Sequence, residues 1–445
     1  MKSEKQGLHA GHVLRWMVAL TILATAPIGA LGADYVNYVS LSGSDGNGGT
    51  SWTDAYGTLT NAIAQASNAI GGGASGASVY VDSGTYTQSV QLVVTQPIAI
   101  IGKGGVGVAD GSQSIIRQTA DVRTLVLSNA NARVEGVVLE NGYLAKNSDG
   151  GNVYLAEGTV TNCVIRNNRY YLQTGGGWGV SGRQQGGGTF IKGGLVVDSV
   201  ISGNGVGHYV WGYPYATYSY GGGVYLSGGT LRRSVVVGNH NRVHVDGYRQ
   251  PADGAGVYLN GSSAIVENCL ISENKGYNSS DIGAAKWRGA GVYLNAGTLR
   301  NCTVVDNRID SSDGSLGVGV RDGGGVYQAG GASVNCIVWD NAVMTTNTAA
   351  VVMTNFYGVA KDVTYSLAPE LSSGTGNQMT DPLFVDGVAG DYRLSDRSSA
   401  VNKGLNQDWM AGALDLDGNP RIQARRVDLG AYEWIAPPGT IVAIR

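Results

Sequence analysis

The stretch Gly221-Gly222-Gly223-Val224-Tyr225-Leu226 returns along the middle of the chain at intervals of 33 to 36 residues. Each copy leads into a short apolar run that ends in an asparagine. A fixed period of this length is typical of proteins built from stacked structural repeats. The copies begin at Gly150, Gly186, Gly221, Gly254, Gly289 and Gly323, and the closing asparagines are Asn168, Asn204, Asn239, Asn274, Asn307 and Asn341.

A small residue stands five positions before each closing asparagine, and a β-branched residue follows it two positions later. The small residues are Cys163, Ser199, Ser234, Cys269, Cys302 and Cys336. Since alternate side chains on a strand face the same side, both positions are predicted to point inward. One unit of strand, glycine turn, strand and asparagine turn cannot bury its own apolar face, so successive units must stack. The sequence therefore predicts an all-β fold, a parallel β-helix (solenoid). Its cysteines are expected to be free, stacked thiols, and the alternative is disulfides between neighbouring coils, which an exported protein allows.

Both ends of such a stack need covering, since open strand edges promote association. Leu59, Ile63, Ala66 and Ile70 recur at helical spacing after Thr58, a residue that can cap a helix N-terminus. They predict an N-terminal helical cap, and the loss of the period after Asn341 predicts an irregular C-terminal cap. The expected organisation is a signal peptide over 1–33, an N-terminal strand and cap helix over 34–75, the parallel β-helix over 76–367 and a C-terminal capping or anchor-type segment over 368–445.

The composition and the first residues favour an exported protein. Charged residues make up only 14% of the 445 residues. Lys2, Lys5 and Arg15 accompany an apolar stretch at 16–26 and small residues at 30–33, the pattern of an export signal. Removing residues 1–32 changes the formal net charge from −3 to −5, and an acidic chain argues against nucleic acid as a partner. No second apolar segment has transmembrane length, so we expect a secreted or cell-surface protein, and we take it to be a monomer.

The residues that follow the signal resemble the start of known β-helix proteins. Tyr38-Val39-Ser40, Ser42–Gly49, Ser51-Trp52 and Ala62-Ile63 are similar to the opening of right-handed parallel β-helix proteins of the pectate-lyase-like superfamily. The repeated glycines and asparagines resemble the repeats of polymorphic outer-membrane adhesins. These resemblances imply that the coil is right-handed.

Segments near the C-terminus resemble the segment called choice-of-anchor type Q, which in such families typically precedes a sorting tail. They are Val363–Ser366, Asp381–Val385, Gly390–Leu394, Asp415–Arg421 and Val427–Glu433. Only residues 434–445 follow, without a membrane helix or an obvious sorting module, so free secretion and surface anchoring both remain open.

Aromatic residues gather in the loops that follow the asparagines. These loops, at 142–149, 169–185, 205–220, 240–253, 275–288 and 308–322, leave the same corner of successive coils and are expected to form one wall. Planar rings with polar edges can stack on sugars. The candidates for carbohydrate binding are Tyr170, Trp178, Tyr209, Trp211, Tyr213, Tyr215, Tyr248 and Trp287. The alternative is that these rings pack beneath one another and support the loops.

A second aromatic set comes from the repeated phrase itself. Tyr154, Phe190, Tyr225, Tyr258, Tyr293 and Tyr327 are expected to form a column. The apolar residues on either side leave open whether the column faces inward or outward, and structural stacking is its expected role.

Charged residues in two of the loops are candidates for catalysis. They are His244, Asp246, Arg249, Asp310 and Arg321. A lyase needs a base beside a uronate carboxyl and a cation that neutralises this carboxyl, whereas a hydrolase needs paired carboxylates. The alternative is that these charges are solvated and have no chemical role.

Asp45 with Asn47, and Asp415 with Asp417, place oxygen ligands in glycine turns, as calcium loops can, although ordinary Asx turns have the same spacing. No other cofactor is indicated. The sequence thus supports two functions. One is an exported, adhesin-like β-helix protein that displays an aromatic loop wall to a polysaccharide or cell-surface glycan without catalysis. The other is a polysaccharide lyase or glycoside hydrolase acting on an acidic polysaccharide.

Overall fold

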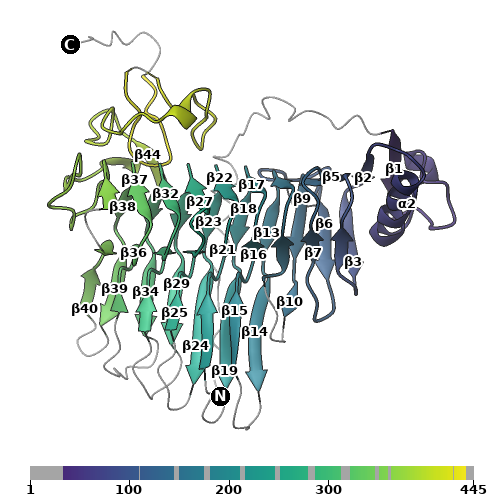
Figure 1. The fold of residues 1–445 in the computed structure, drawn as a ribbon, viewed down its shortest axis with the longest axis horizontal. Coiled ribbons are helices and arrows are strands. Elements are labelled where there is room, and N and C mark those ends of the chain that lie inside the picture. The colour runs from purple at the N-terminus through teal and green to yellow at the C-terminus, as the bar shows by residue number, and fades with distance from the viewer. Residues whose placement is uncertain are drawn as a thin grey trace.

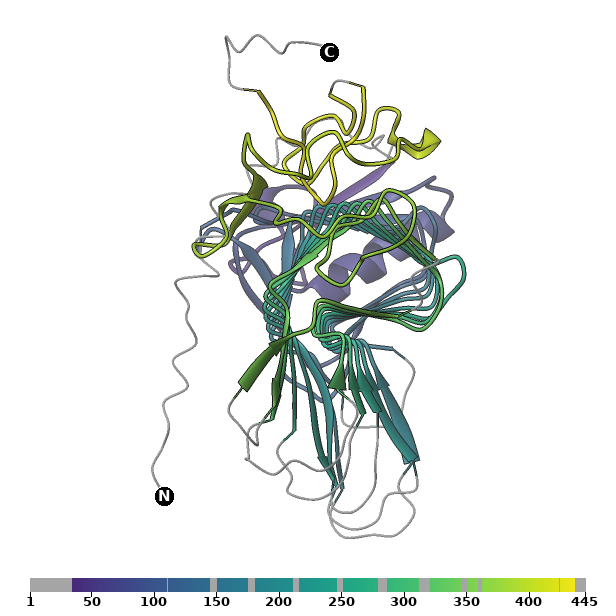
Figure 2. The same ribbon diagram turned by 90° about the vertical axis from the view of Figure 1, so that its left-hand side faces the viewer.

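The structure, a computed structural model, describes residues 34–109, 111–144, 150–174, 181–210, 216–245, 251–278, 286–311, 321–345, 350–358, 362–423 and 425–436. Its body is a right-handed parallel β-helix whose coils contribute short strands to three parallel sheets, named A, B and C here (Figure 1). Viewed along the axis, successive coils superimpose around one interior (Figure 2). The predicted fold class is confirmed.

Sheet A contains β1 (Tyr35–Val39), β2 (Ala77–Val81), β5 (Ile98–Gly102), β8 (Arg133–Glu135), β12 (Thr159–Thr161), β17 (Leu195–Val197), β22 (Thr230–Arg232), β27 (Ile265–Glu267), β32 (Thr298–Arg300), β37 (Ala332–Val334) and β42 (Val363–Thr364). Sheet B contains β3 (Gly84–Gln88), β6 (Ser114–Gln118), β9 (Val137–Glu140), β13 (Val164–Arg166), β18 (Val200–Ser202), β23 (Val235–Val237), β28 (Leu270–Ser272), β33 (Thr303–Val305) and β38 (Ile337–Trp339). Sheet C contains β4 (Leu92–Val94), β7 (Leu125–Leu127), β11 (Val153–Leu155), β16 (Thr189–Ile191), β21 (Val224–Leu226), β26 (Val257–Leu259), β31 (Val292–Leu294), β36 (Val326–Gln328) and β41 (Phe356–Gly358).

Alternate side chains along each strand point into the interior and fill it. In β21, Val224 and Leu226 are fully buried in the main core, whereas Tyr225 lies on the outer face in a separate aromatic cluster. Cys269, Cys302 and Cys336 are buried and free on successive coils, as expected for stacked thiols.

The closing asparagines form a buried ladder along the axis. Asn274 Nδ2 donates to Oδ1 of Asn307 (2.8 Å) and to the carbonyl of Val236 on the preceding coil (3.0 Å). Its own Oδ1 accepts from both the backbone N–H and Nδ2 of Asn239, each at 3.0 Å. The same pattern joins Asn168 to Asn204 at one end and Asn341 to Asn355 at the other. The asparagine side chains therefore link each coil to the coils before and after it.

The N-terminal end is closed by helix α2 (Leu59–Gly71), as the apolar spacing predicts. Thr58 Oγ1 accepts from the N–H of Asn61 (3.2 Å), which caps the first turn. Leu59, Ala62, Ile63 and Ala66 are buried against the first coils.

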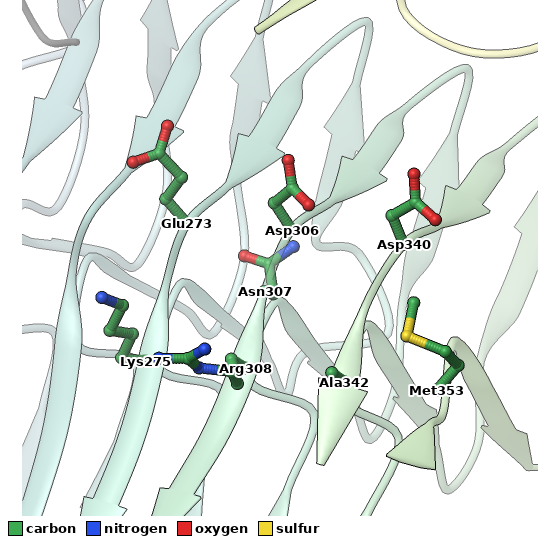
Figure 3. Close-up of a pocket in the computed structure, with 8 residues that line it drawn as sticks. All are labelled: Glu273, Lys275, Asp306, Asn307, Arg308, Asp340, Ala342 and Met353. Carbon is green, nitrogen blue, oxygen red and sulfur yellow. The ribbon is translucent and has the colours of Figure 1, made fainter. Parts of the chain in front are cut away.

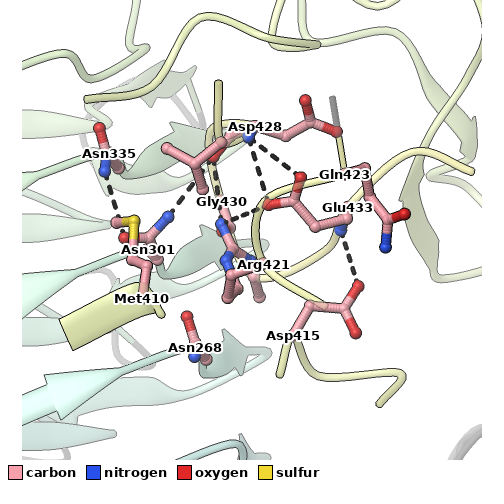
Figure 4. Close-up of polar contacts among 12 residues, drawn as sticks. Asn268, Asn301, Asn335, Met410, Asp415, Arg421, Gln423, Asp428, Gly430 and Glu433 are labelled. Carbon is pink, nitrogen blue, oxygen red and sulfur yellow. Dashed lines mark hydrogen bonds and ion pairs between the residues drawn. The ribbon is translucent and has the colours of Figure 1, made fainter. Parts of the chain in front are cut away.

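The C-terminal segment is irregular, as predicted, and lies along the outer side of the last coils (Figure 1). Beyond β42 it contains the hairpin β43 (Phe384–Asp386) and β44 (Asp391–Leu394) and the short helix η3 (Asp408–Met410). The backbone N–H of Ala431 donates to Thr303 Oγ1 (2.9 Å), and Asn301 Nδ2 donates to the carbonyl of Asp428 (3.4 Å; Figure 4). Side-chain contacts with the coils therefore hold this segment in place. No helix in the described ranges has the length and apolar character needed to cross a bilayer.

Candidate functional site

The segments predicted as loops are largely strands, which corrects the expected loop wall. After each closing asparagine the chain leaves the coil along one strand and returns along another, forming two further sheets that project from the solenoid (Figure 2). Sheet D contains β10 (Tyr143–Leu144), β14 (Arg169–Thr174), β19 (Gly205–Val210), β24 (His240–Val245), β29 (Lys275–Asn278), β34 (Arg308–Ser311), β39 (Ala342–Thr345) and β40 (Ala350–Met353). Sheet E contains β15 (Ser181–Gln185), β20 (Ala216–Tyr220), β25 (Pro251–Asp253), β30 (Lys286–Arg288) and β35 (Arg321–Asp322). We call sheets D and E together the flange.

Two carbohydrate candidates lie in the core of the flange. Trp287 is 2% exposed and packs with Ala252 and Ile309 across the two sheets. Its ring occupies the space beside Gly276, where a Cβ atom would come within 3.1 Å of Trp287 Cε3. Tyr170 is fully buried, and its hydroxyl donates to the carbonyl of Arg183 (3.2 Å). Neither ring presents a face to a sugar in solution, because the inner faces of the two sheets enclose both rings. Their burial fits the alternative that these rings pack inside the protein and support the segments around them.

Most of the remaining candidates lie outside the described residues. These are Trp178, Trp211, Tyr213, Tyr215, Asp246, Tyr248 and Arg249. Tyr209, His244 and Arg321 belong to β19, β24 and β35, but their side chains are also outside the described set. Asp310 is described, and its Oδ1 lies 2.6 Å from Arg308 Nε.

The N-terminal pair proposed for calcium serves the start of the cap helix. Asp45 Oδ1 accepts from the backbone N–H groups of Gly57 (3.1 Å) and Thr58 (2.9 Å), and Oδ2 accepts from Thr58 Oγ1 (2.8 Å). Asn47 Nδ2 donates to the carbonyl of Ala55 (2.9 Å). These are turn contacts of the Asx type.

The C-terminal pair is also engaged by protein groups. Asp415 accepts from the backbone N–H groups of Asn419 (2.6 Å) and Glu433 (2.8 Å), and Asp417 pairs with Arg393 Nε (2.6 Å). In the described part of the chain, no three His, Cys, Asp or Glu side chains are grouped so that they could hold a metal ion.

The tyrosine column faces outward and is stacked. Tyr258 and Tyr293 lie 4.8 Å apart between ring centroids with their planes 4° apart, and Arg288 covers Tyr293 at 4.8 Å. Asp253 pairs with Arg288 at 2.7 Å and is 1% exposed. The column therefore packs against the base of sheet E. Tyr357 of β41 stacks on Tyr327 and extends the column by one ring, which is 47% exposed.

A row of carboxylates marks the corner where sheet B passes into sheet D. The residue before each closing asparagine has a positive φ, which glycine adopts at little cost and which aspartate and asparagine adopt more readily than other residues. Two coils place Gly203 (φ 62°) and Gly238 (φ 63°) there, and the next three place Glu273 (φ 56°), Asp306 (φ 54°) and Asp340 (φ 51°). Three successive coils therefore present a carboxylate at the same turn.

A second row brings cations beside the acids. Lys275 and Arg308 follow two residues after Glu273 and Asp306, on the first residues of β29 and β34. Together with Asp340, Ala342 and Met353 they line a cavity of about 440 Å³ (Figure 3). In Figure 3 the three carboxylates point to the same side of the corner. We call this cavity the corner groove.

The electrostatics of the corner groove differ along its length. Burial raises the pKa of Asp306, opposed by the Tyr392 hydroxyl, which donates to Asp306 Oδ2. Burial also raises the pKa of Asp340, to which the neighbouring carboxylates of Asp306 and Asp381 add. Lys275 and Glu273 form no ion pair with any described residue. The groove therefore combines acids of raised proton affinity with an unpaired ammonium group and a guanidinium.

The sequence analysis does not predict the corner groove, because it places the candidate catalytic residues in the loops. A signal was nevertheless present. Three consecutive repeats have an acidic residue directly before the ladder asparagine, in Glu273-Asn274, Asp306-Asn307 and Asp340-Asn341. Earlier repeats have glycine at this position, so a comparison of residue types across all repeats does not reveal the acidic column.

No family model matches this chain, and no curated protein matches it. Among solved structures, the crystal structure of pectate lyase Pel9A superimposes with a TM-score of 0.44 at 14% identity, covering 90% of this chain and 96% of that one.

Proposed function

We propose that this chain is an exported β-helix protein that binds a polysaccharide lengthwise along the corner groove. One observation supports this: acidic and basic side chains occupy equivalent positions on consecutive coils and line one cavity. Since coils repeat about every 4.8 Å, an extended polymer parallel to the axis meets the same kinds of group on each coil. A glycan is the polymer whose hydroxyls and charged groups suit this mixture.

The two rows have separate tasks in this proposal. Glu273, Asp306 and Asp340 accept hydrogen bonds from sugar hydroxyls, and such bonds to charged acceptors are the stronger kind. Lys275 and Arg308 donate to ring oxygens or to uronate carboxylates. The proposal replaces the aromatic loop wall with a charged corner, since the described aromatic candidates are buried.

The test measures retention of the purified chain by a panel of neutral and acidic polysaccharides immobilised in native gels. Lys275→Ala and Asp306→Asn should each weaken retention at least tenfold. Lys192 is exposed in the turn between β16 of sheet C and β17 of sheet A, and Lys192→Ala should leave retention unchanged. Equal retention of all four proteins, or no retention by any polysaccharide, would show that the corner groove is not a glycan site.

Cleavage of the bound glycan is the second candidate function, and the paired carboxylates favour it. Asp306 and Asp340 lie on adjacent coils, so about 4.8 Å separates their backbones. This is near the carboxyl separation of retaining glycosidases, in which one acid of raised pKa protonates the leaving oxygen. Burial raises the pKa of both groups here.

Two product assays separate binding from cleavage. New reducing ends without ultraviolet absorbance indicate hydrolysis, and new reducing ends with the ultraviolet band of unsaturated uronates indicate elimination. Asp306→Asn and Asp340→Asn should abolish either activity, whereas Lys192→Ala should leave it unchanged. Retention without new reducing ends leaves the non-catalytic function standing.

The proposed site of action is the cell surface or the surrounding medium. The basis is the export pattern in residues 1–33, which lie outside the described ranges, together with the anchor-like resemblance of the C-terminal segment. Expression of the full chain in a secreting host, followed by determination of the mature N-terminus, tests this part. A mature chain that still begins at Met1 would contradict it.

A further inference from the structure

A second cavity lies between the C-terminal segment and the coils, and it shares no residue with the corner groove. Its volume is about 270 Å³. The coils contribute Arg232, Arg233 and Asn268, and the segment contributes the ring of Trp409 and the backbone around Leu414. This is room for one small molecule rather than for a polymer.

The charged groups that line this cavity are two guanidinium groups whose donors are only partly used. Arg232 contacts Glu267 through Nε, and Arg233 contacts Asp198 through Nε and Nη2 at 2.7 Å. Asp415 also lies near Arg233, but its oxygens accept from Asn419 and Glu433. In the described structure, terminal N–H groups of both arginines therefore remain without an acceptor, next to a cavity.

Arg233 also occupies a strained backbone position. Its φ is 41°, in the left-handed region, at a turn where four other coils have Asn162, Asn268, Asn301 and Asn335. Asparagine tolerates this region better than residues with long side chains do. A long side chain kept in this region indicates that it is needed there.

Asn268 provides a hydrogen-bond acceptor beside the two arginines. In the neighbouring coils, Asn335 Nδ2 donates to Asn301 Oδ1 (3.2 Å), and the N–H of Leu405 donates to Asn335 Oδ1 (2.7 Å). Asn268 Nδ2 donates to the carbonyl of Leu414 (2.9 Å), but its Oδ1 is buried without a partner. Since buried acceptors in native proteins are nearly always satisfied, and no described protein group donates to this oxygen, it is available to a donor on a bound molecule.

We infer that this cavity binds a small carboxylate that carries hydroxyl groups. The carboxylate takes the open N–H groups of Arg232 and Arg233, a geometry that guanidinium favours. A hydroxyl donates to Asn268 Oδ1, and the carbon skeleton lies against Trp409, whose ring is fixed by Arg300 at 4.1 Å from its centroid. Sugar acids have this chemistry.

The inference is tested by calorimetric titration of the full mature chain with three probes of similar size. D-gluconate has both the carboxylate and the hydroxyls, sorbitol has only the hydroxyls, and hexanoate has only the carboxylate. We expect saturable binding of gluconate, at least tenfold weaker binding of the other two probes, and at least tenfold weaker gluconate binding by Arg232→Gln.

Arg232→Gln should fold normally, because Glu267 keeps its second partner, Arg300 (2.7 Å). An unchanged melting temperature checks this, and Arg397→Gln, which changes an exposed arginine of the C-terminal segment outside the cavity, is the control. Absence of saturable gluconate binding, equal binding of all three probes, or undiminished binding by a folded Arg232→Gln would overturn the inference. Since no corner-groove residue is altered, failure here leaves the polysaccharide proposal standing.

Discussion

Single polar side chains in this fold act on two coils at once. Each ladder asparagine satisfies groups on the coil before it and on the coil after it, and all of these groups are buried. A residue that cannot both accept from one neighbouring coil and donate to the other therefore leaves hydrogen-bonding groups unsatisfied on both coils. The cost of each such group is about 1–3 kcal/mol.

Asn274→Leu is accordingly expected to lower the urea midpoint of unfolding strongly. It removes the acceptor of two Asn239 bonds and the donor to Val236. Asn295→Ala, which removes an exposed bond to Asn260, is the control and should change little. Equal midpoints for wild type and Asn274→Leu would show that the ladder does not stabilise the stack.

His240 is predicted to make the stability depend on pH. Its ring lies over Gly205 and contacts the Tyr171 hydroxyl, and burial, aided by Arg169 and Arg242, lowers its pKa to about 4. Between the unfolded pKa of about 6.5 and pH 4, the unfolded chain binds a proton that the folded chain does not. Stability should fall by up to about 3 kcal/mol as the pH drops through this window.

The comparison with His240→Gln isolates this contribution, since carboxylates of raised pKa such as Asp306 and Asp340 act in the opposite sense. Urea midpoints of both proteins between pH 7 and pH 4 give the difference. The wild type should lose more stability than His240→Gln as the pH falls. Parallel curves would contradict a neutral, buried His240.

At the scale of elements, the flange is held together by complementary shapes. Gly276 on sheet D leaves the space that Trp287 on sheet E fills. A neighbouring coil places Asn241 at the position of Gly276, and its Nδ2 donates to the carbonyl of Ser219 (2.8 Å). The two sheets therefore form a small sandwich whose inner contacts differ from coil to coil.

Gly276→Val is expected to destabilise the flange by about 1–3 kcal/mol, because the added carbons overlap the indole ring. Combining it with Trp287→Leu should recover part of the loss, as a double-mutant cycle would show. Gly71→Ala, where an added Cβ meets nothing within 4 Å, is the control. An unchanged melting temperature for Gly276→Val would mean that the sheets are not packed as described.

The sequence predicts the coil better than the flange for a physical reason. The small residue of each repeat and the β-branched residue two positions later, such as Cys269 and Ile271, recur with period two at every repeat, so strand and facing can both be inferred there. In β19, Gly205, Gly207 and His208 interrupt the alternation, and the strand is held by parallel pairing with β14 and β24. The sequence does not predict that the side chains of Glu273, Asp306 and Asp340 gather in one groove. The direction of a side chain in a turn depends on the backbone geometry of the turn, and the hydropathy pattern does not give that geometry.

At the scale of the whole molecule, the C-terminal segment is tied to the coils through a buried ionic cluster. Arg421 is fully buried, lies 2.9 Å from Glu433 and donates to the carbonyls of Asp428 and Gly430 (Figure 4). Burial raises the pKa of Glu433, which Arg421 opposes. The segment also supplies Tyr392 to the corner groove, so its docking and the proposed function are linked.

Arg421→Met is expected to release this segment, since a buried carboxylate without its partner costs about 3–5 kcal/mol. Limited proteolysis should then cut within residues 379–436 while the coils resist. Arg421→Met combined with Glu433→Met should restore part of the resistance, because apolar residues can replace a buried ion pair. Resistance of Arg421→Met equal to that of the wild type would contradict this role.

Equivalent charges on successive coils are proposed to form one linear glycan site at the corner of sheets B and D. Hydrogen–deuterium exchange with and without the retained polysaccharide measures whether a glycan occupies this corner. We expect slower exchange in residues 271–278, 305–311 and 340–345, with no change in helix α2. Protection confined to other coils, with these three stretches unchanged, would contradict it.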